Sequence, residues 1–592
     1  MKRKIRFLIA MLLVLSLTLV GLTSCSDLGG ESGGESEDES GGEQPDGSGN
    51  EQPGGNGNEQ PGGSSDEQPG NVEGGIGDGV YWEKAPIIVQ IAKGSDSKTY
   101  IAGADKYYVG ETNENPDIID VAVKNRNEAA ARYANVEVTY KYLPDNSSND
   151  WGSCTLMYGS QFYIPGQTPD IASGFVYDIT LCALKNQVAN LRSNSSYSES
   201  TYGNGQNYFG FNEDNYDGDD YFYEYMKSIT LSDDKMYVLA SNYTLDFIRA
   251  MSVIPVNVKL MNSISYDLLP KTDGITKEDG ETNVEYFYKQ VYAGKWSYEL
   301  LAAYSKAVWS GEENAYSNLS DVLGFVVSTG GHTANTLFFN HSIQILKKTP
   351  IYDIDEINDK HLVDCVCGDY LVKIPFTNDD FLAYTEHLYN TLSEFGKNGI
   401  ITVSQGASKQ ISEKFANDEV LFGGIASLYT LESDNYQAAH DGFVIAPIPI
   451  YMDGDNYNTT VNINARAIAL CNKTTSFEQS ALYLDYLSKN SEDIVNEYFK
   501  EYFINDENNE DLNAEALKLI VSKATLDRNQ LFYTIICSYS YGYDKTPLHH
   551  YYSMTKYQPL MFPDFEGFAA TVESKQSLKL LIRRWNEPGY GL

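Results

Sequence analysis

The sequence predicts an α/β protein with two or more lobes, which follow a disordered N-terminal segment. Predicted strands alternate with predicted helices between residues 87 and 488, a pattern typical of α/β domains built on a mainly parallel sheet. Residues 76 to 592 are more than one hydrophobic core usually supports, so at least two lobes are expected.

The N-terminus has the layout of an export signal. A basic head, Lys2–Arg6, precedes an apolar run, Phe7–Val20, which is shorter than the ~20 residues that a membrane-spanning helix needs. The following Leu22-Thr23-Ser24-Cys25 resembles the lipobox of a bacterial lipoprotein signal. This resemblance implies cleavage before Cys25 and lipid attachment to its sulfur, with a second acyl chain needed for stable anchoring. The alternative is a plain secretory signal.

Residues Ser26–Gly75 contain almost nothing that a fold could bury, so we expect them to be disordered. Glu-Gln-Pro recurs every eight residues, at Glu43, Glu51, Glu59 and Glu67, without the apolar face that a stacked repeat requires. The segment is therefore predicted to be a tether, with a root-mean-square reach of roughly 40 Å.

The composition limits the classes of partner. A formal net charge of −39 repels phosphate backbones, so nucleic acid is excluded as a partner. The chain has 46 Tyr against 24 Phe and 5 Trp, and tyrosine suits surfaces that stack on polar ligands such as sugars. A lineage bias toward tyrosine would give the same composition.

Six cysteines besides Cys25 are too few for a disulfide framework in a chain of this size. Cys365 and Cys367 fall on one face of a predicted strand, where a direct bridge would be strained. We predict buried free thiols, and no zinc spacing is recognisable. The six are Cys154, Cys182, Cys365, Cys367, Cys471 and Cys537.

Four elements are predicted in the first part of the chain. They are a strand at Ile87–Ile91, a helix at Lys124–Ala134, a strand at Val136–Tyr140 and a strand at Thr168–Ser173. Ligands of parallel sheets lie beyond the carboxyl ends of the strands, which places Phe175, Tyr177 and Asp178 at the rim of a crevice.

The middle of the chain repeats this alternation. The predicted elements are a helix after the N-cap Ser297, strands at Val322–Val327, Phe443–Pro449 and Ala465–Leu470, an apolar run at Val420–Tyr429 and a helix at Phe477–Ser488. The aromatic-rich tail, Leu526–Leu592, gives no clear pattern.

The order of several segments resembles extracellular solute-binding protein family 1 of ABC importers. The segments are Pro169–Ala172, Met236–Ala240 leading to Val256-Asn257, the helix opened by Trp296, Phe415 with Gly424, Phe443–Pro449 and Phe477–Ser488. The sequence departs from the family in its length, in the tail after Lys489 and in lacking a tryptophan after Gly424.

The resemblance implies a two-lobed, periplasmic-binding-protein-like fold of type 2, with hinge strands near Ile248–Pro255 and Thr459–Asn464 and a ligand enclosed between the lobes. The implied domains are a signal peptide (1–24), the lipidated tether (25–75), lobe I (76–253, with 460–500 returning to it), lobe II (254–459) and a helical, aromatic tail packed across the lobes (501–592). We expect a monomer without cofactor on the extracellular face of the cell membrane, held there by its lipid anchor. Its partners would be a carbohydrate and the transmembrane subunits of an ABC permease.

The resemblance also implies a set of ligand-binding residues, for each of which core packing or loop capping is the alternative role. They are Phe175, Tyr177, Asn242, Tyr243, Asp246, His332, Asn335, Phe338, Tyr429 and Asn464.

The alternative function is that of a surface-tethered glycoside hydrolase. Its chemistry needs two carboxylates at a set separation, which a sequence with 82 acidic residues cannot identify. His-Glu-x-x-His and phosphate-binding glycine loops are absent from the sequence, and the single Gly-x-Ser-x-Gly match, Gly30–Gly34, lies in the tether. No catalytic residue is therefore predicted.

One stretch has the ligand spacing of an EF-hand calcium loop, although a solvated acidic loop would look the same. The matching residues are Glu213, Asn215, Asp217, Gly218, Asp219 and Glu224.

Overall fold

The computed structural model of the protein divides into two units, Met1–Tyr81 and Trp82–Leu592, and all described residues belong to the second. They are residues 83–91, 105–110, 116–142, 168–192, 209, 211, 220–230, 235–312, 319–328, 336, 347–350, 365–367, 370–373, 399–403, 408–439, 442–451, 454–462, 465–504 and 510–525. The predictions for the signal peptide, Cys25 and the tether therefore concern residues outside this set.

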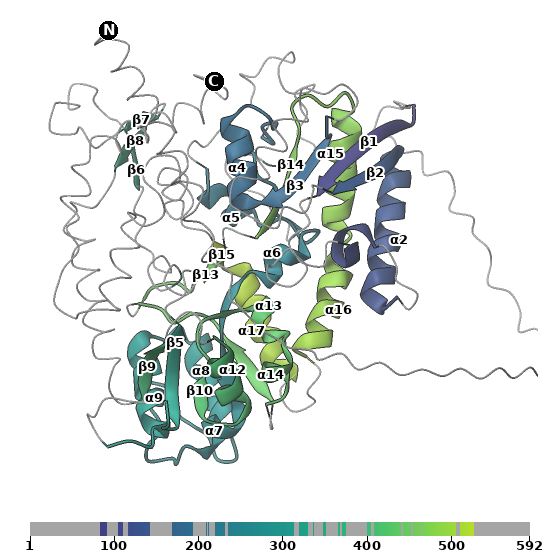
Figure 1. Ribbon diagram of the computed structural model, residues 1–592. Coiled ribbons are helices and arrows are strands. Elements are labelled where there is room, and N and C mark those ends of the chain that lie inside the picture. Colours follow the sequence, from purple (N-terminus) through teal and green to yellow (C-terminus); the bar gives the residue numbers. More distant parts are fainter. Residues whose placement is uncertain are drawn as a thin grey trace, which may run out of the picture. The chain divides into compact units, whose positions relative to one another are not determined.

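The first sheet has four strands in the order β14-β3-β1-β2 (Figure 1). β1 is parallel to both β2 and β3, whereas β14 is antiparallel to β3. The strands are β1 (Ala85–Ile91), β2 (Val136–Tyr142), β3 (Ile171–Phe175) and β14 (Arg466–Leu470). β14 comes after the strands of the second sheet in the sequence. The first sheet therefore gains its fourth strand only after the chain has returned to it.

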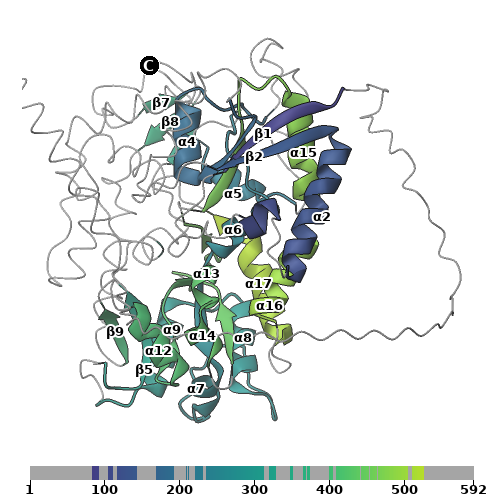
Figure 2. The ribbon, with the colours of Figure 1, turned by 45° about the vertical axis from the view of Figure 1, so that its right-hand side comes forward.

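Helices cover this sheet. α2 and α15 pack against each other and against β2, and α4 packs on β3 and β14, as Figure 2 shows for α2 and α15. The helical elements around the sheet are the π-helix η2 (Asp105–Val109), α2 (Ile118–Tyr133), α4 (Val176–Leu184), α5 (Tyr223–Ser228), α6 (Leu245–Arg249) and α15 (Phe477–Lys489).

The second sheet has the order β11-β4-β10-β5-β9, with β12 also paired to β4. β5 is parallel to β9 and β10, but β4 is antiparallel to all three of its partners. The strands are β4 (Ser252–Asn257), β5 (Leu323–Ser328), β9 (Ile400–Val403), β10 (Val420–Phe422), β11 (Ala426–Ser427) and β12 (Phe443–Ala446).

The second sheet has its own helices. α9 packs on β5, and α7 and α12 pack on β10. The helices are α7 (Val258–Ser263), α8 (Asn283–Tyr292), α9 (Tyr298–Val308), α12 (Ser408–Ala416), α13 (Leu428–Leu431) and α14 (Asp434–Gln437).

The remaining elements are two smaller sheets, of three and two strands, and two helices. Asn513 of α17 donates from its side chain to the backbone of Phe443 and Phe503 and accepts from the N–H of Ile445, which ties α17 to β12. These elements are β6 (Lys347–Pro350), β7 (Cys365–Cys367), β8 (Tyr370–Lys373), β13 (Thr459–Thr460), β15 (Ala524–Thr525), α16 (Glu492–Tyr502) and α17 (Glu510–Ser522).

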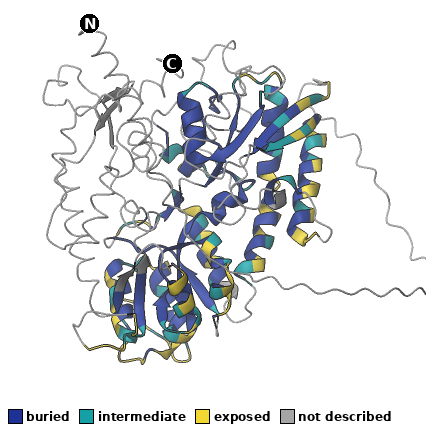
Figure 3. Ribbon diagram, in the orientation of Figure 1, coloured by how far each residue is buried: buried dark blue, intermediate teal, exposed yellow. Residues whose placement is uncertain are grey.

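Burial follows the expected layering. The inner strands β3 and β14 of the first sheet and β4, β10 and β12 of the second are buried, β2 is mostly half-buried or exposed, and exposed residues gather on the helices (Figure 3). No helix among the described residues is both long and apolar enough to cross a membrane.

The predicted α/β class with two sheet-centred lobes is confirmed. The mainly parallel pattern holds for the first sheet, but β4 runs against its neighbours in the second. α2 begins at Ile118, six residues before the predicted start. The Asp117 carboxylate accepts from the Asp120 N–H, and the Asp117 N–H donates in return to the Asp120 carboxylate, so the helix starts at this capping box.

Two cysteines test the thiol prediction directly. Cys182 and Cys471 are buried free thiols, as predicted, and burial raises the pKa of each. Cys365 and Cys367 lie in β7, as predicted from the sequence.

Candidate functional site

Two chain segments connect the sheets and lie side by side. One runs through α6 into β4, and the other runs from β13 into β14. Met251 forms a β-bridge with Val461, and the N–H of Asn462 donates to the carbonyl of Ala250 at 3.3 Å. Both contacts fall within the ranges predicted as hinge strands, so the site is built where the chain passes between the sheets. Hinge motion there stays a prediction.

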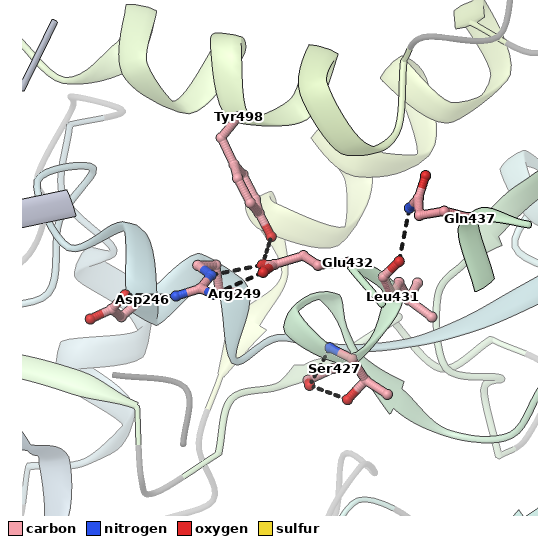
Figure 4. A network of polar contacts seen from close by, with 8 residues as sticks. Asp246, Arg249, Ser427, Leu431, Glu432, Gln437 and Tyr498 are labelled. Carbon is pink, nitrogen blue, oxygen red and sulfur yellow. Dashed lines mark hydrogen bonds and ion pairs between the residues drawn. The ribbon is translucent and has the colours of Figure 1, made fainter. Parts of the chain in front are cut away.

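Arg249, the last residue of α6, is held by two carboxylates. Its Nε and Nη2 donate to Oε1 and Oε2 of Glu432 at 2.7 and 2.8 Å, and Nη1 donates to Oδ1 of Asp246 at 3.2 Å (Figure 4). The two parallel bonds to Glu432 form the bidentate arrangement that fixes a guanidinium in both position and plane. The Arg249 side chain is only 4% exposed, so water does not screen these contacts.

The polar contacts continue on both sides of this pair. The other oxygen of Asp246 accepts from Nε of Arg466 at 2.8 Å, and Nη1 of Arg466 donates to the Ser173 hydroxyl at 3.0 Å. On the opposite side the Tyr498 hydroxyl donates to Glu432 at 2.8 Å (Figure 4). A chain of contacts thus runs from β3 and β14 of the first sheet through α6 to α13 and α16. We call it the ionic chain.

Tyrosine rings cover the guanidinium groups of the ionic chain. The Cζ atom of Arg249 lies 4.6 Å from the ring centroid of Tyr107 and 4.8 Å from that of Tyr429. Arg466 lies 4.2 Å from the centroid of Tyr108. Cation–π contacts of this kind are favourable where the cation is removed from water. Each ring therefore helps to hold its arginine side chain in position, and each arginine helps to hold its ring.

A third arginine adjoins the ionic chain. Arg126 lies 4.7 Å from the ring centroid of Tyr243 and donates to Asn127 and Ser491, and burial lowers its pKa. The ring of Tyr243 meets that of Tyr108 edge-on at 5.1 Å. The tyrosines therefore connect Arg126 to Arg466 without a direct contact between the two cations.

The protonation of these groups follows from burial and charge. Burial alone would lower the pKa of Arg249, but the hydrogen bonds and charge of Glu432 raise it well above the ordinary value. Burial raises the pKa of Tyr107 and Tyr108, and the neighbouring Arg249 and Arg466 oppose that rise only in part. The ionic chain is therefore a set of charged arginines beside neutral tyrosines at neutral pH.

Several residues predicted as ligand contacts meet here. Asp246 and Tyr429 contact Arg249, and Tyr243 contacts Arg126. Phe175, at the end of β3, lies opposite Arg466 in the register of β14. Asp246 and Tyr243 are fully enclosed, whereas Tyr429 is half-buried and reaches solvent.

The other predicted residues have different positions. Tyr177 is 3% exposed and, like Phe175 at 6%, belongs to the core rather than to an open rim. Asn242 is half-buried, in the turn before α6. His332, Asn335, Phe338 and Asn464 lie outside the described residues.

Sequence reasoning did not identify Arg249, Arg466, Glu432 or the two adjacent tyrosines Tyr107-Tyr108. Arg249 and Arg466 each stand alone inside an apolar stretch, and a lone charge in such a stretch signals a buried ion pair. Glu432 has no comparable signal, because it is 183 residues from Arg249.

Within the described residues, no group of three or more His, Cys, Asp or Glu side chains is placed to hold a metal ion. Of the predicted calcium ligands, Glu224 is exposed on α5, and Glu213, Asn215, Asp217 and Asp219 lie outside the described set.

The arrangement suits binding. Both carboxylates of the ionic chain are engaged by guanidinium groups, and its half-buried members include an aromatic side chain, Tyr429. A half-buried tyrosine offers a flat apolar face and a hydroxyl, the two features with which proteins recognise a sugar ring.

No family model and no curated protein match the sequence. Solved structures do match its fold. The GacH receptor of Streptomyces glaucescens is 11% identical, with 84% of this chain and 98% of that chain covered and a TM-score of 0.40. The sugar-binding protein MalE of Xanthomonas citri is 11% identical, with coverage of 85% and 99% and a TM-score of 0.46.

A family 1 extracellular solute-binding protein from Bifidobacterium longum subsp. infantis is 10% identical, with 86% of this chain and all of that chain covered and a TM-score of 0.41. The family in this description is the one that the sequence resembles.

Proposed function

We propose that the protein is an extracellular solute-binding lipoprotein that captures a carbohydrate between its two α/β lobes and delivers it to an ABC permease without chemical change. The lipid on Cys25 would hold it at the outer face of the cell membrane, and the acidic tether would give the binding unit its reach.

One observation carries the proposal. A half-buried tyrosine, Tyr429, lies on a rigid ionic chain at the two paired segments that connect the sheets. A ligand that stacks on this ring would also contact the connection between the lobes, so its binding would favour one relative position of the lobes over another. The export signal and the tether support the location.

A thermal-shift screen of the purified protein tests the proposal. The panel contains mono- and oligosaccharides, among them maltose, maltotriose and maltotetraose. A ligand that binds only the folded state at a hundred times its Kd adds about 2.7 kcal/mol of stability, so a true ligand raises Tm clearly.

Product analysis separates the receptor from a glycoside hydrolase. After long incubation with each stabilising sugar, chromatography should recover the sugar intact, because a receptor binds without turnover. Release of smaller sugars, or no shift with any carbohydrate, would contradict the proposal.

A further inference from the structure

The ring of Tyr429 is held by a side chain that belongs to a distant element. Tyr429 and Glu432 lie three residues apart, at α13 and its C-cap, and three-residue spacing places both on one face of a helix. Arg249 of α6 contacts both, as a cation over the Tyr429 ring and as a fork on the Glu432 carboxylate. One guanidinium thereby fixes two positions of the same short helix.

We propose that Arg249 is a positioning residue for ligand binding, which holds the Tyr429 ring in the plane where a sugar stacks. The inference rests on the proposed function. Arg249 is 4% exposed, so we expect it to act on binding through the ring that it contacts, Tyr429, and not by touching the sugar.

The surroundings of Arg249 explain why an arginine is required. Its Nε, Nη1 and Nη2 are all engaged, with Glu432 and Asp246, and Tyr107 covers the guanidinium as Tyr429 does. A lysine keeps the charge but has neither the planar fork nor the flat surface that packs between rings. Replacing arginine by lysine should therefore leave the ring of Tyr429 freer to rotate.

Fixing the ring matters because α13 has only four residues. The helix gains one cap from the Ser427 hydroxyl, which accepts from the Thr430 N–H at 3.3 Å, and a helix of this length has little stability of its own. A ring that is already ordered spares the ligand the entropy cost of ordering it.

A double-mutant cycle tests the inference. Titration calorimetry measures the Kd of maltotetraose, or of the panel sugar with the largest thermal shift, for the wild type and for the variants R249K, Y429A and R249K/Y429A. We expect R249K to weaken binding by about three- to tenfold in the wild-type background and to have no further effect in Y429A. Y429F keeps the ring, so R249K should weaken binding there as in the wild type.

R132K is the matched control, because Arg132 is exposed on α2, where it pairs with the exposed Glu128. It should leave Kd unchanged. If R249K does not fold, E432Q replaces it in the cycle, since this change loosens the fork and keeps the side-chain shape.

Two results would overturn the inference while leaving the proposed function intact. One is wild-type affinity in R249K, and the other is an equal loss of affinity in the presence and absence of the Tyr429 ring, which would mean that Arg249 acts through the general stability of the fold. Absence of carbohydrate binding by the wild-type protein would instead reject the proposed function, and the inference with it.

Discussion

Asp246 holds two arginines that come from different parts of the chain. Arg249 is on the same short helix, whereas Arg466 is 220 residues away at the start of β14. All three side chains are almost fully buried. Removing one member of such a group leaves uncompensated charge in the interior, which costs more than the contact itself contributes.

We expect Asp246→Asn to lower the free energy of unfolding by about 3–5 kcal/mol, because both arginines lose their shared negative partner. Chemical denaturation monitored by circular dichroism measures the change. The control is Glu515→Gln, which removes an exposed pair with Lys518 and should cost about 1 kcal/mol or less. Equal costs for the two variants would show that the buried group does not behave as an ion pair.

Helix starts are the clearest case in which a short sequence pattern fixes an element. α8 begins at a capping box in which the Thr282 hydroxyl accepts from the Glu285 N–H at 3.2 Å and the Glu285 carboxylate accepts from the Thr282 N–H at 2.6 Å. Ser297 caps α9, as the sequence predicts. The start of α2 was predicted too late, because the reciprocal pair Asp117 and Asp120 uses two aspartates instead of the commoner Ser or Thr with Glu.

We expect Thr282→Ala to lower the free energy of unfolding by about 1 kcal/mol through loss of the cap at α8. Thermal and chemical denaturation of the variant measure it. Thr282→Ser keeps the hydroxyl and should stay close to the wild type. A Ser variant as unstable as the Ala variant would assign the effect to the lost methyl group instead.

At the scale of the whole molecule, many of the tyrosines among the described residues lie in the interior. Tyr225, Tyr243, Tyr298 and many others are buried, and burial raises the pKa of each above the ordinary value of 10. For the partly exposed Tyr292, burial and the charge of Glu515 raise the pKa to about 12. A tyrosine whose pKa is higher in the folded state contributes stability that is fully present below pH 10.

We therefore expect stability to fall as the pH rises above about 10, because the unfolded chain then releases phenolic protons that the folded protein retains. Denaturation at a series of alkaline pH values should show this loss, and the tyrosinate absorbance should rise mainly in step with unfolding. A rise of that absorbance to its full amplitude near pH 10 in a protein that remains folded would contradict the prediction.

The sequence by itself determined the α/β class, most of the strands and helices, and the need for more than one lobe. These follow from local patterns, such as the alternation in β2 or the cap at Ser297, which depend on neighbours a few residues apart. The sequence also predicted Tyr243, Asp246 and Tyr429 as site residues, and these three lie at the connection between the sheets.

Only the tertiary structure decided what those residues contact. Asp246 holds arginines inside the protein, and Tyr429 rests on Arg249 because Glu432, 183 residues from Arg249, brings α13 against α6. Contacts over such distances depend on how the chain passes between the sheets and returns. No local periodicity encodes that path, because the ionic chain forms only where the two connecting segments pair in the folded protein.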